Sequence, residues 1–233
     1  MNRLLSMAAL LLILAACNPR LSNGLRLNDL QKDVEMVTDK GTILIRLSDS
    51  TPLHRDNFLR LVKQHYYDSI LFHRVINHFM VQAGDPDSKR AKAGAELGNG
   101  GPNYTVPAEF RASLFHKKGM IAAAREGDDV NPLKASSGSQ FYLTQGKVFT
   151  NAGLDSIETF RLQGRKIPAA QRAVYTTIGG TPHLDLNYTV FGEVISGLSV
   201  IDSIATVTTS GRQGGDRPVQ DVRILKARLV KRK

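Results

Sequence analysis

The sequence predicts a single, mainly β domain with a few helices. Residues 34–37 and 42–47 are rich in apolar and β-branched residues and are separated by Asp39-Lys40-Gly41, which is the pattern of a β-hairpin. A second pair of short strands, residues 72–76 and 79–83, is joined by a bend at Asn77-His78. The chain has 233 residues, of which 42% are hydrophobic, so it is long enough to bury a core of its own.

The first residues have the pattern of an export signal. Arg3 precedes an apolar run over residues 4–14 that is too short to span a membrane, so residues 1–16 are predicted to be a signal peptide. Residues 14–17 (LAAC) resemble the bacterial lipobox, in which the cysteine is acylated after cleavage. The alternative is an ordinary secretory signal with a cysteine near its cleavage site. We expect a lipoprotein that faces the periplasm, lipidated on Cys17 and followed by a linker over residues 17–32. Whether the inner or the outer membrane holds it stays open.

The chain is basic. Its net charge is +10, or +9 after residues 1–16 and the charge of Arg3 are removed. A basic surface attracts acidic partners, and nucleic acid is one candidate. An exported lipoprotein does not meet nucleic acid in its compartment, so we expect attraction to acidic cell-envelope surfaces and no nucleic-acid partner.

Cys17 is the only cysteine, which excludes a disulfide within the chain. Residues 231–233 are predicted to be a basic tail.

The remaining elements follow in order along the chain. Asp49 and Pro52 mark the start of a helix that ends near His65. Residues 86–103 are rich in glycine but lack the order of a phosphate-binding P-loop, so they are predicted to be a flexible loop. Small and apolar residues predict strands over residues 118–125 and 222–230, and an amphipathic pattern predicts a helix over residues 197–205. Residues 137–143 and 190–194 are expected to be strands by the family resemblance described below.

Residues 144–182 interrupt this order with two predicted helices. Apolar residues recur at helical spacing from Leu154 to Leu162 and stop at Gly164. The second helix follows Pro168 and ends before Gly179. We expect an insertion on the surface of the domain, where additional packing is the default interpretation and a role in recognition stays open.

The hairpin over residues 72–83 mixes polar and apolar side chains on one face. With a period of two, Arg74 and Gln82 share that face with Phe72, Ile76 and Met80. One interpretation is a hairpin whose Arg74 and Gln82 simply face solvent. However, the order FHRVI, a two-residue bend and FMVQAGD resembles the signature of the cyclophilins, the peptidyl-prolyl cis-trans isomerases. The segments GSQFY (residues 138–142) and VFGEV (residues 190–194) resemble the later motifs of that family in the same order.

This resemblance covers residues 33–230 and implies a fold and an activity. The fold would be a closed eight-stranded antiparallel barrel capped by two helices. The activity would be rotation of the peptide bond before proline, in extended or unfolded segments of exported proteins, so that their folding is assisted. The resemblance assigns catalytic roles to Arg74, as a hydrogen-bond donor, and to Gln82. The residues that it implies for substrate binding are Phe79, Met80, Ala124, Arg125, Gln140, Tyr142, His183, Leu184 and Tyr188.

Three positions depart from the family pattern. The family usually has Phe where this chain has Tyr142, frequently Trp at His183, and often His at Tyr188. The changes at His183 and Tyr188, together with the helical insertion, motivate an alternative function, a non-catalytic module or chaperone holdase that binds proline-containing peptides in the same groove. The rotation breaks no bond, so we expect no cofactor. The six histidines show no HExxH or similar spacing, so no metal site is expected either, and a monomer is the default.

Overall fold

The computed structural model describes residues 24–232. The predicted signal peptide and Cys17 therefore lie outside the described residues. None of the helices formed within residues 24–232 is both long and apolar enough to cross a membrane.

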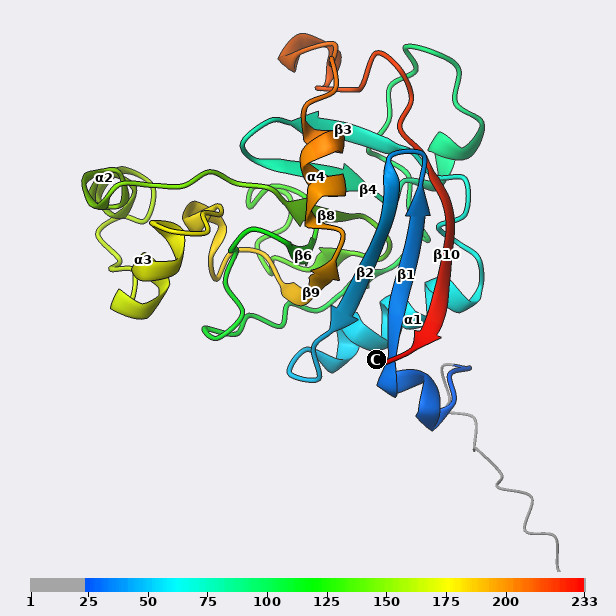
Figure 1. Ribbon diagram of the computed structural model, residues 1–233, viewed down its shortest axis with the longest axis horizontal. Coiled ribbons are helices and arrows are strands. Elements are labelled where there is room, and N and C mark those ends of the chain that lie inside the picture. The colour runs from blue at the N-terminus through cyan, green and yellow to red at the C-terminus, as the bar shows by residue number, and fades with distance from the viewer. Residues whose placement is uncertain (1–23, 233) are drawn as a thin grey trace, which may run out of the picture.

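An eight-stranded antiparallel sheet dominates the structure (Figure 1). Its strands lie in the order β10-β1-β2-β9-β6-β8-β4-β3. Their bounds are β1 (Lys32–Thr38), β2 (Gly41–Leu47), β3 (Phe72–Ile76), β4 (Met80–Ala83), β6 (Met120–Ala123), β8 (Phe141–Thr144), β9 (Val190–Ser196) and β10 (Ile224–Lys231). Two short strands, β5 (Thr105–Val106) and β7 (Ser136–Ser137), form a separate pair. The mainly β prediction is confirmed, including both predicted hairpins, β1–β2 and β3–β4.

The prediction of a closed barrel was wrong, because the curled sheet stays open between β3 and β10. An isolated bridge between Leu71 and Arg223 joins the two edges at one end. There the amide N–H of Phe72 donates to the Val222 carbonyl, and that of Ile224 donates to the Ile70 carbonyl, each over 2.8 Å. Farther along β3, the N–H of Val75 donates to the carbonyl of Asp216 over 2.9 Å. The loop before β10 thus occupies the part of the β3 edge that a closing strand would need.

The main core fills the inside of the curl, and two helices cover it. Helix α1 (Pro52–Lys63) buries Phe58 and Val62, and helix α4 (Leu198–Ala205) buries Ile201 and Ile204. Four short 3-10 helices lie in the connections: η1 (Leu27–Gln31), η2 (Pro86–Arg90), η3 (Pro182–Leu184) and η4 (Arg212–Gly214). The structure adds residues 25–31 to the domain, because Asp29 is buried beside β1 and forms ion pairs with Lys32 (2.9 Å) and Lys63 (2.7 Å).

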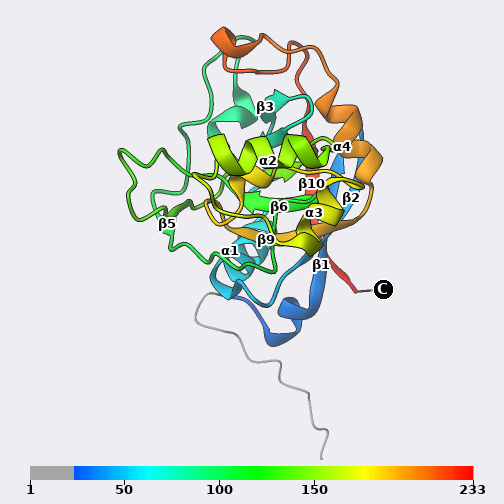
Figure 2. The ribbon, with the colours of Figure 1, turned by 90° about the vertical axis from the view of Figure 1, so that its left-hand side faces the viewer.

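The insertion forms the two helices that the sequence predicts. Helices α2 (Asn151–Phe160) and α3 (Ala169–Tyr175) lie together on the side away from β1 and β10 (Figures 1 and 2). They share a small core of their own, made of Leu154, Leu162, Ile167 and Tyr175. The insertion therefore has a small core that is separate from the main core.

Candidate active site

The outer face of the sheet carries a row of side chains that crosses five strands. Strand pairing places Arg74 opposite Gln82, Gln82 opposite Tyr142, Tyr142 opposite Ala122, and Ala122 opposite Val190. Directly paired residues point to the same face of a sheet, so the row runs from a cation at the β3 edge into apolar surface. We call the apolar part the outer cluster; its buried members are Met80, Met120, Ala122, Tyr142 and Val190, and Phe79, Leu184 and Tyr188 pack at its margin.

A chain of hydrogen bonds holds Arg74 in place. Its Nη1 lies 3.5 Å from Oε1 of Gln82, and Nε2 of Gln82 donates to Oε1 of Gln140 over 3.0 Å. Gln140 in turn donates to the carbonyl oxygens of Gly98 (2.8 Å) and Gly100 (2.9 Å). The guanidinium has five N–H donors, and its side chain is 42% exposed, so this support leaves donors facing outward.

Asp216 supports Arg74 from the other side, and sequence reasoning missed it. Its carboxylate Oδ2 lies 3.6 Å from Nε of Arg74. Asp216 sits in the loop after η4 with a left-handed backbone (φ 56°), and its carbonyl accepts the N–H of Val75. The signal available in the sequence was the glycine-rich segment before Asp216. This segment indicates a turn but does not show which residue the turn contacts.

His183 forms one wall beside the outer cluster. Its ring stacks on Phe79 with the ring centroids 5.5 Å apart and an interplanar angle of 21°. Burial, assisted by the positive charge of Arg161 in the insertion, lowers the pKa of His183 to about 4. The ring is therefore neutral at pH 7 and presents an uncharged flat surface next to Phe79.

Tyr188 packs against the outer cluster beside Tyr142. Its ring meets Tyr142 edge to face at 5.9 Å, and the guanidinium of Arg125 lies over it, 4.6 Å from the ring centroid. Arg125 is fixed by a 2.8 Å hydrogen bond from its Nε to the carbonyl of Asn187. The backbone of Ala124 is committed to the fold, since its N–H donates to Gln140 and its carbonyl accepts from Ser137. The structure thus brings the residues predicted for catalysis and substrate binding to the outer cluster or its immediate supports, while the predicted lipidation site, Cys17, lies outside the described residues.

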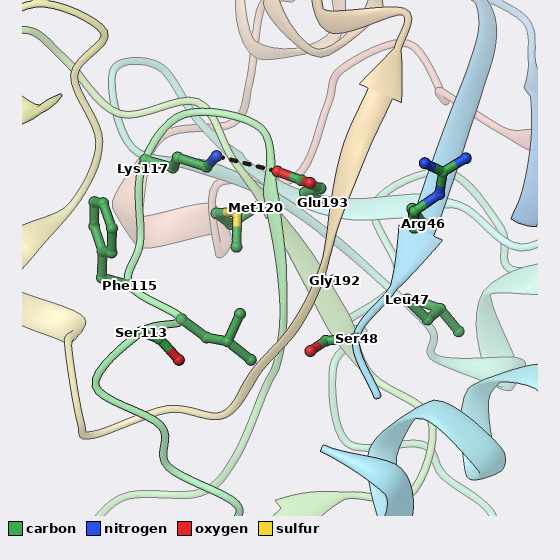
Figure 3. Close-up of a pocket in the computed structure, with 10 residues that line it drawn as sticks. Arg46, Leu47, Ser48, Ser113, Phe115, Lys117, Met120, Gly192 and Glu193 are labelled. Carbon is green, nitrogen blue, oxygen red and sulfur yellow. Dashed lines mark ion pairs between the residues drawn. The ribbon is translucent and has the colours of Figure 1, made fainter. Parts of the chain in front are cut away.

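A pocket of about 140 Å³ lies farther along the same outer face (Figure 3). Met120 joins it to the outer cluster, while Phe115, Lys117 and Glu193 form other parts of its lining. Lys117 and Glu193 pair at 3.1 Å on one side. The pocket contains no predicted site residue, so we assign the chemistry to the outer cluster with Arg74.

Comparison with known proteins decides the family. The model of the cyclophilin type peptidyl-prolyl cis-trans isomerase/CLD family matches residues 33–229. The chain belongs to this family. Its cyclophilin relatives include a Staphylococcus haemolyticus protein named "Putative peptidyl-prolyl cis-trans isomerase", 36% identical over 205 residues that span 88% of this chain and 93% of the relative. A Staphylococcus aureus protein of the same name is 36% identical over 190 residues, or 81% of this chain and 87% of the relative.

Solved structures show the same fold. A crystal structure of a cyclophilin type isomerase from Cryptosporidium parvum has a TM-score of 0.60 at 20% sequence identity and covers 87% of this chain and 99% of its own. The cyclophilin resemblance and the mainly β fold inferred from the sequence are confirmed. The roles of the individual site residues stay predictions, which the geometry above makes specific.

Proposed function

We propose that this cyclophilin catalyses rotation of X-Pro bonds in exported polypeptides and thereby assists their folding. The barrier to this rotation is about 18–20 kcal/mol, because resonance gives the C–N bond partial double-bond character. No bond is broken, so a catalyst has only to stabilise the twisted amide more than either planar form. The observation that carries the proposal is the guanidinium of Arg74, held between Gln82 and Asp216 at the end of an apolar surface.

In this mechanism the outer cluster holds the proline ring and Arg74 acts on the prolyl nitrogen. Phe79, Met80 and Leu184 supply apolar contacts to the ring. As the amide twists, its nitrogen loses conjugation and becomes a hydrogen-bond acceptor, which an N–H of Arg74 satisfies. This hydrogen bond is weak in the planar states and strong in the twisted state, so it lowers the barrier.

The substrate of this chain is proposed to be a proline-containing segment in an extended conformation. A second crystal structure of the Cryptosporidium parvum cyclophilin, 20% identical to this chain, was determined in the presence of the dipeptide Ala-Pro. The neutral ring of His183 beside Phe79 also suits an uncharged proline ring. We propose that the enzyme works as a monomer without a cofactor.

We also propose that the enzyme is a lipoprotein facing the periplasm. The support is the sequence of residues 1–17, with its short apolar run and Cys17 in a lipobox pattern. Metabolic labelling with a radioactive fatty acid tests this directly. Wild-type protein should be labelled and Cys17→Ala should not, and equal labelling of the two would contradict lipidation at Cys17.

The activity is tested by the rate of cis-to-trans conversion in a short X-Pro peptide. The Arg74→Ala variant should lose about 100-fold in kcat/KM, the scale expected for removing one charged donor in the transition state. Arg228→Ala is the matched control, because it deletes an exposed arginine of β10 that pairs with Glu35 of β1, at the other end of the strand order from β3. Wild-type protein that leaves the peptide at its uncatalysed rate would contradict the proposal.

The alternative, a holdase without catalysis, predicts a different pattern. Suppression of client aggregation would survive Arg74→Ala and would fall when residues 151–180 are deleted. The catalytic proposal instead expects the isomerase rate to fall in Arg74→Ala.

A further inference from the structure

Among the buried members of the outer cluster, one side chain carries a hydroxyl group. It belongs to Tyr142, which is 4% exposed. A buried hydroxyl without a partner costs about 1–3 kcal/mol, so its partner matters for the position of the ring. That partner is Nε2 of His116, at 2.9 Å, on a side chain that is completely buried.

The hydrogen bonds continue from His116 to the insertion. Nδ1 of His116 lies 2.9 Å from Oδ1 of Asp185, and the hydroxyl of Tyr175 lies 2.6 Å from Oδ2 of the same carboxylate. Tyr175 is the last residue of α3 and is fully buried. Four buried side chains thus form one line from the insertion to the outer cluster, and we call them the buried relay: Tyr142, His116, Asp185 and Tyr175.

One proton arrangement satisfies all three hydrogen bonds. With the ring proton of His116 on Nδ1, Asp185 accepts the Nδ1–H of His116 and the O–H of Tyr175. Nε2 of His116 then accepts the O–H of Tyr142. Burial raises the pKa of both tyrosines, so both hydroxyls keep their protons. Every side-chain donor of the relay has an acceptor inside it.

The insertion holds the same residues by further contacts. Nη2 of Arg165 donates to the carbonyl of Asp185 over 2.8 Å, and the N–H of Thr181 donates to the carbonyl of His116 over 2.8 Å. The ring of Tyr175 also meets Phe115 edge to face at 5.5 Å. The position of the His116–Asp185 pair therefore depends on where the insertion is packed.

We propose that the insertion, residues 144–182, is a positioning element for the proline-binding surface and sets the place of the Tyr142 ring through the buried relay. This proposal rests on the proposed isomerase function. It replaces additional packing, the default interpretation of the sequence, with a defined role for the insertion. Tyr175, Asp185 and His116 act as positioning residues, since none of them lies in the outer cluster.

The proposal predicts which kinetic constant changes. Tyr142 would contact the proline ring in the planar and the twisted states alike, so moving it changes the binding of both states equally. Such uniform binding appears in KM and leaves kcat nearly unchanged. Loss of the transition-state donor Arg74 would instead lower kcat, so the two effects are separable.

The test is a double-mutant cycle in the full domain. Tyr175→Phe should raise KM for the X-Pro peptide about fivefold, the scale of one net hydrogen bond, with kcat unchanged. In a Tyr142→Phe background, which disconnects the outer cluster from His116, the same substitution should change KM less than about twofold. Equal effects in both backgrounds, or no effect of Tyr175→Phe, would overturn the proposal.

Tyr104→Phe is the matched control, because it removes a tyrosine hydroxyl that contacts Asn57 and Arg60 outside the relay. It should leave KM at the wild-type value. A rise in KM equal to that of Tyr175→Phe would show a general effect of lost hydroxyls and would also overturn the proposal.

An NMR measurement tests the buried relay independently of the proposed isomerase activity. Met80 lies in the outer cluster with Tyr142, whereas Met36 lies in the main core. Tyr175→Phe should shift the ¹³C-methyl resonance of Met80 and leave that of Met36 in place. If wild-type protein shows no isomerase activity, the proposed function fails, and the Met80 resonance still decides whether the relay reaches the outer cluster. An unchanged Met80 resonance would contradict the relay.

Discussion

At the residue scale, the guanidinium of Arg74 is held in position by a neighbouring side chain on each of two sides. Gln82 provides a neutral acceptor at 3.5 Å and Asp216 provides a carboxylate at 3.6 Å. A guanidinium held from two directions loses less freedom when it binds a substrate than a mobile one, which favours catalysis. The arrangement makes Asp216 a positioning residue that acts through Arg74.

The effect of Asp216 can be measured by Asp216→Asn, which keeps the shape of the side chain and removes its charge. We expect kcat to fall about threefold, since a partly exposed ion pair contributes on the order of 0.5–1 kcal/mol. Asp221→Asn, which changes a carboxylate in the same loop that pairs with Arg217, is the control. Equal kcat values for the two variants would show that Asp216 does not position Arg74.

Sequence and structure agree best for residues in local motifs. Arg74, Gln82 and Gln140 stand at fixed spacings on or beside strands, so a pattern of period two and a family motif were sufficient to find them. Asp216 and His116 lie in connections without periodicity, and strand pairing together with loop packing brings them to the site. Contacts of this kind depend on the tertiary fold, which a local pattern does not encode.

At the element scale, the insertion is joined to the domain by a close approach of backbones. Gly180 forms isolated bridges with Lys117 and Lys147, and its φ of 154° belongs to a region that suits glycine. A Cβ on Gly180 would collide with the carbonyl oxygen of His116. The junction therefore requires glycine at this position, next to His116 of the buried relay.

Substitution of this glycine should weaken the fold. Gly180→Ala is expected to lower the free energy of unfolding by about 2 kcal/mol or more, because the added methyl group combines steric overlap with backbone strain. Gly101→Ala is the control, since a Cβ there meets no atom within 4 Å. Urea denaturation of both variants measures the difference, and a Gly180→Ala variant as stable as Gly101→Ala would contradict the tight junction.

At the scale of the whole molecule, the open edge of the sheet marks the limit of what the sequence could predict. The hairpins, the two capping helices and the inserted helices follow from local periodicity and turn residues. Closure of the barrel depends on the partner of the β3 edge. Because the loop of Asp216 takes that edge at Val75, the sheet stays open beside Arg74, and the loop gains its contact with this arginine.

The whole fold should also lose stability in acid. Burial lowers the pKa of His54, and it lowers the pKa of His73 and of His183 to about 4. Between the unfolded pKa of about 6.5 and the folded pKa of about 4 the unfolded chain binds more protons, so the free energy of unfolding falls as the pH decreases through this window. Denaturant titrations at about pH 7 and about pH 4.5 bracket most of the window and measure the change.

His73→Phe isolates one part of this pH dependence. Neither ring nitrogen of His73 has a hydrogen-bond partner within residues 24–232, so phenylalanine should fit with little loss at pH 7. The variant should lose less stability than wild-type protein between the two pH values. If His73→Phe lost as much stability between the two pH values as wild-type protein, His73 would not contribute to the pH dependence.

The central claim is that the fixed fork of Arg74 donates to the prolyl nitrogen, and Arg74→Lys tests it most directly. Lysine keeps the positive charge but loses the planar set of donors that Gln82 and Asp216 hold in place. The measurement is kcat/KM for cis-to-trans conversion of an X-Pro peptide by wild-type protein and by this variant. We predict that wild-type protein accelerates the conversion and that Arg74→Lys loses most of that acceleration, while wild-type kcat/KM in the lysine variant would contradict the account.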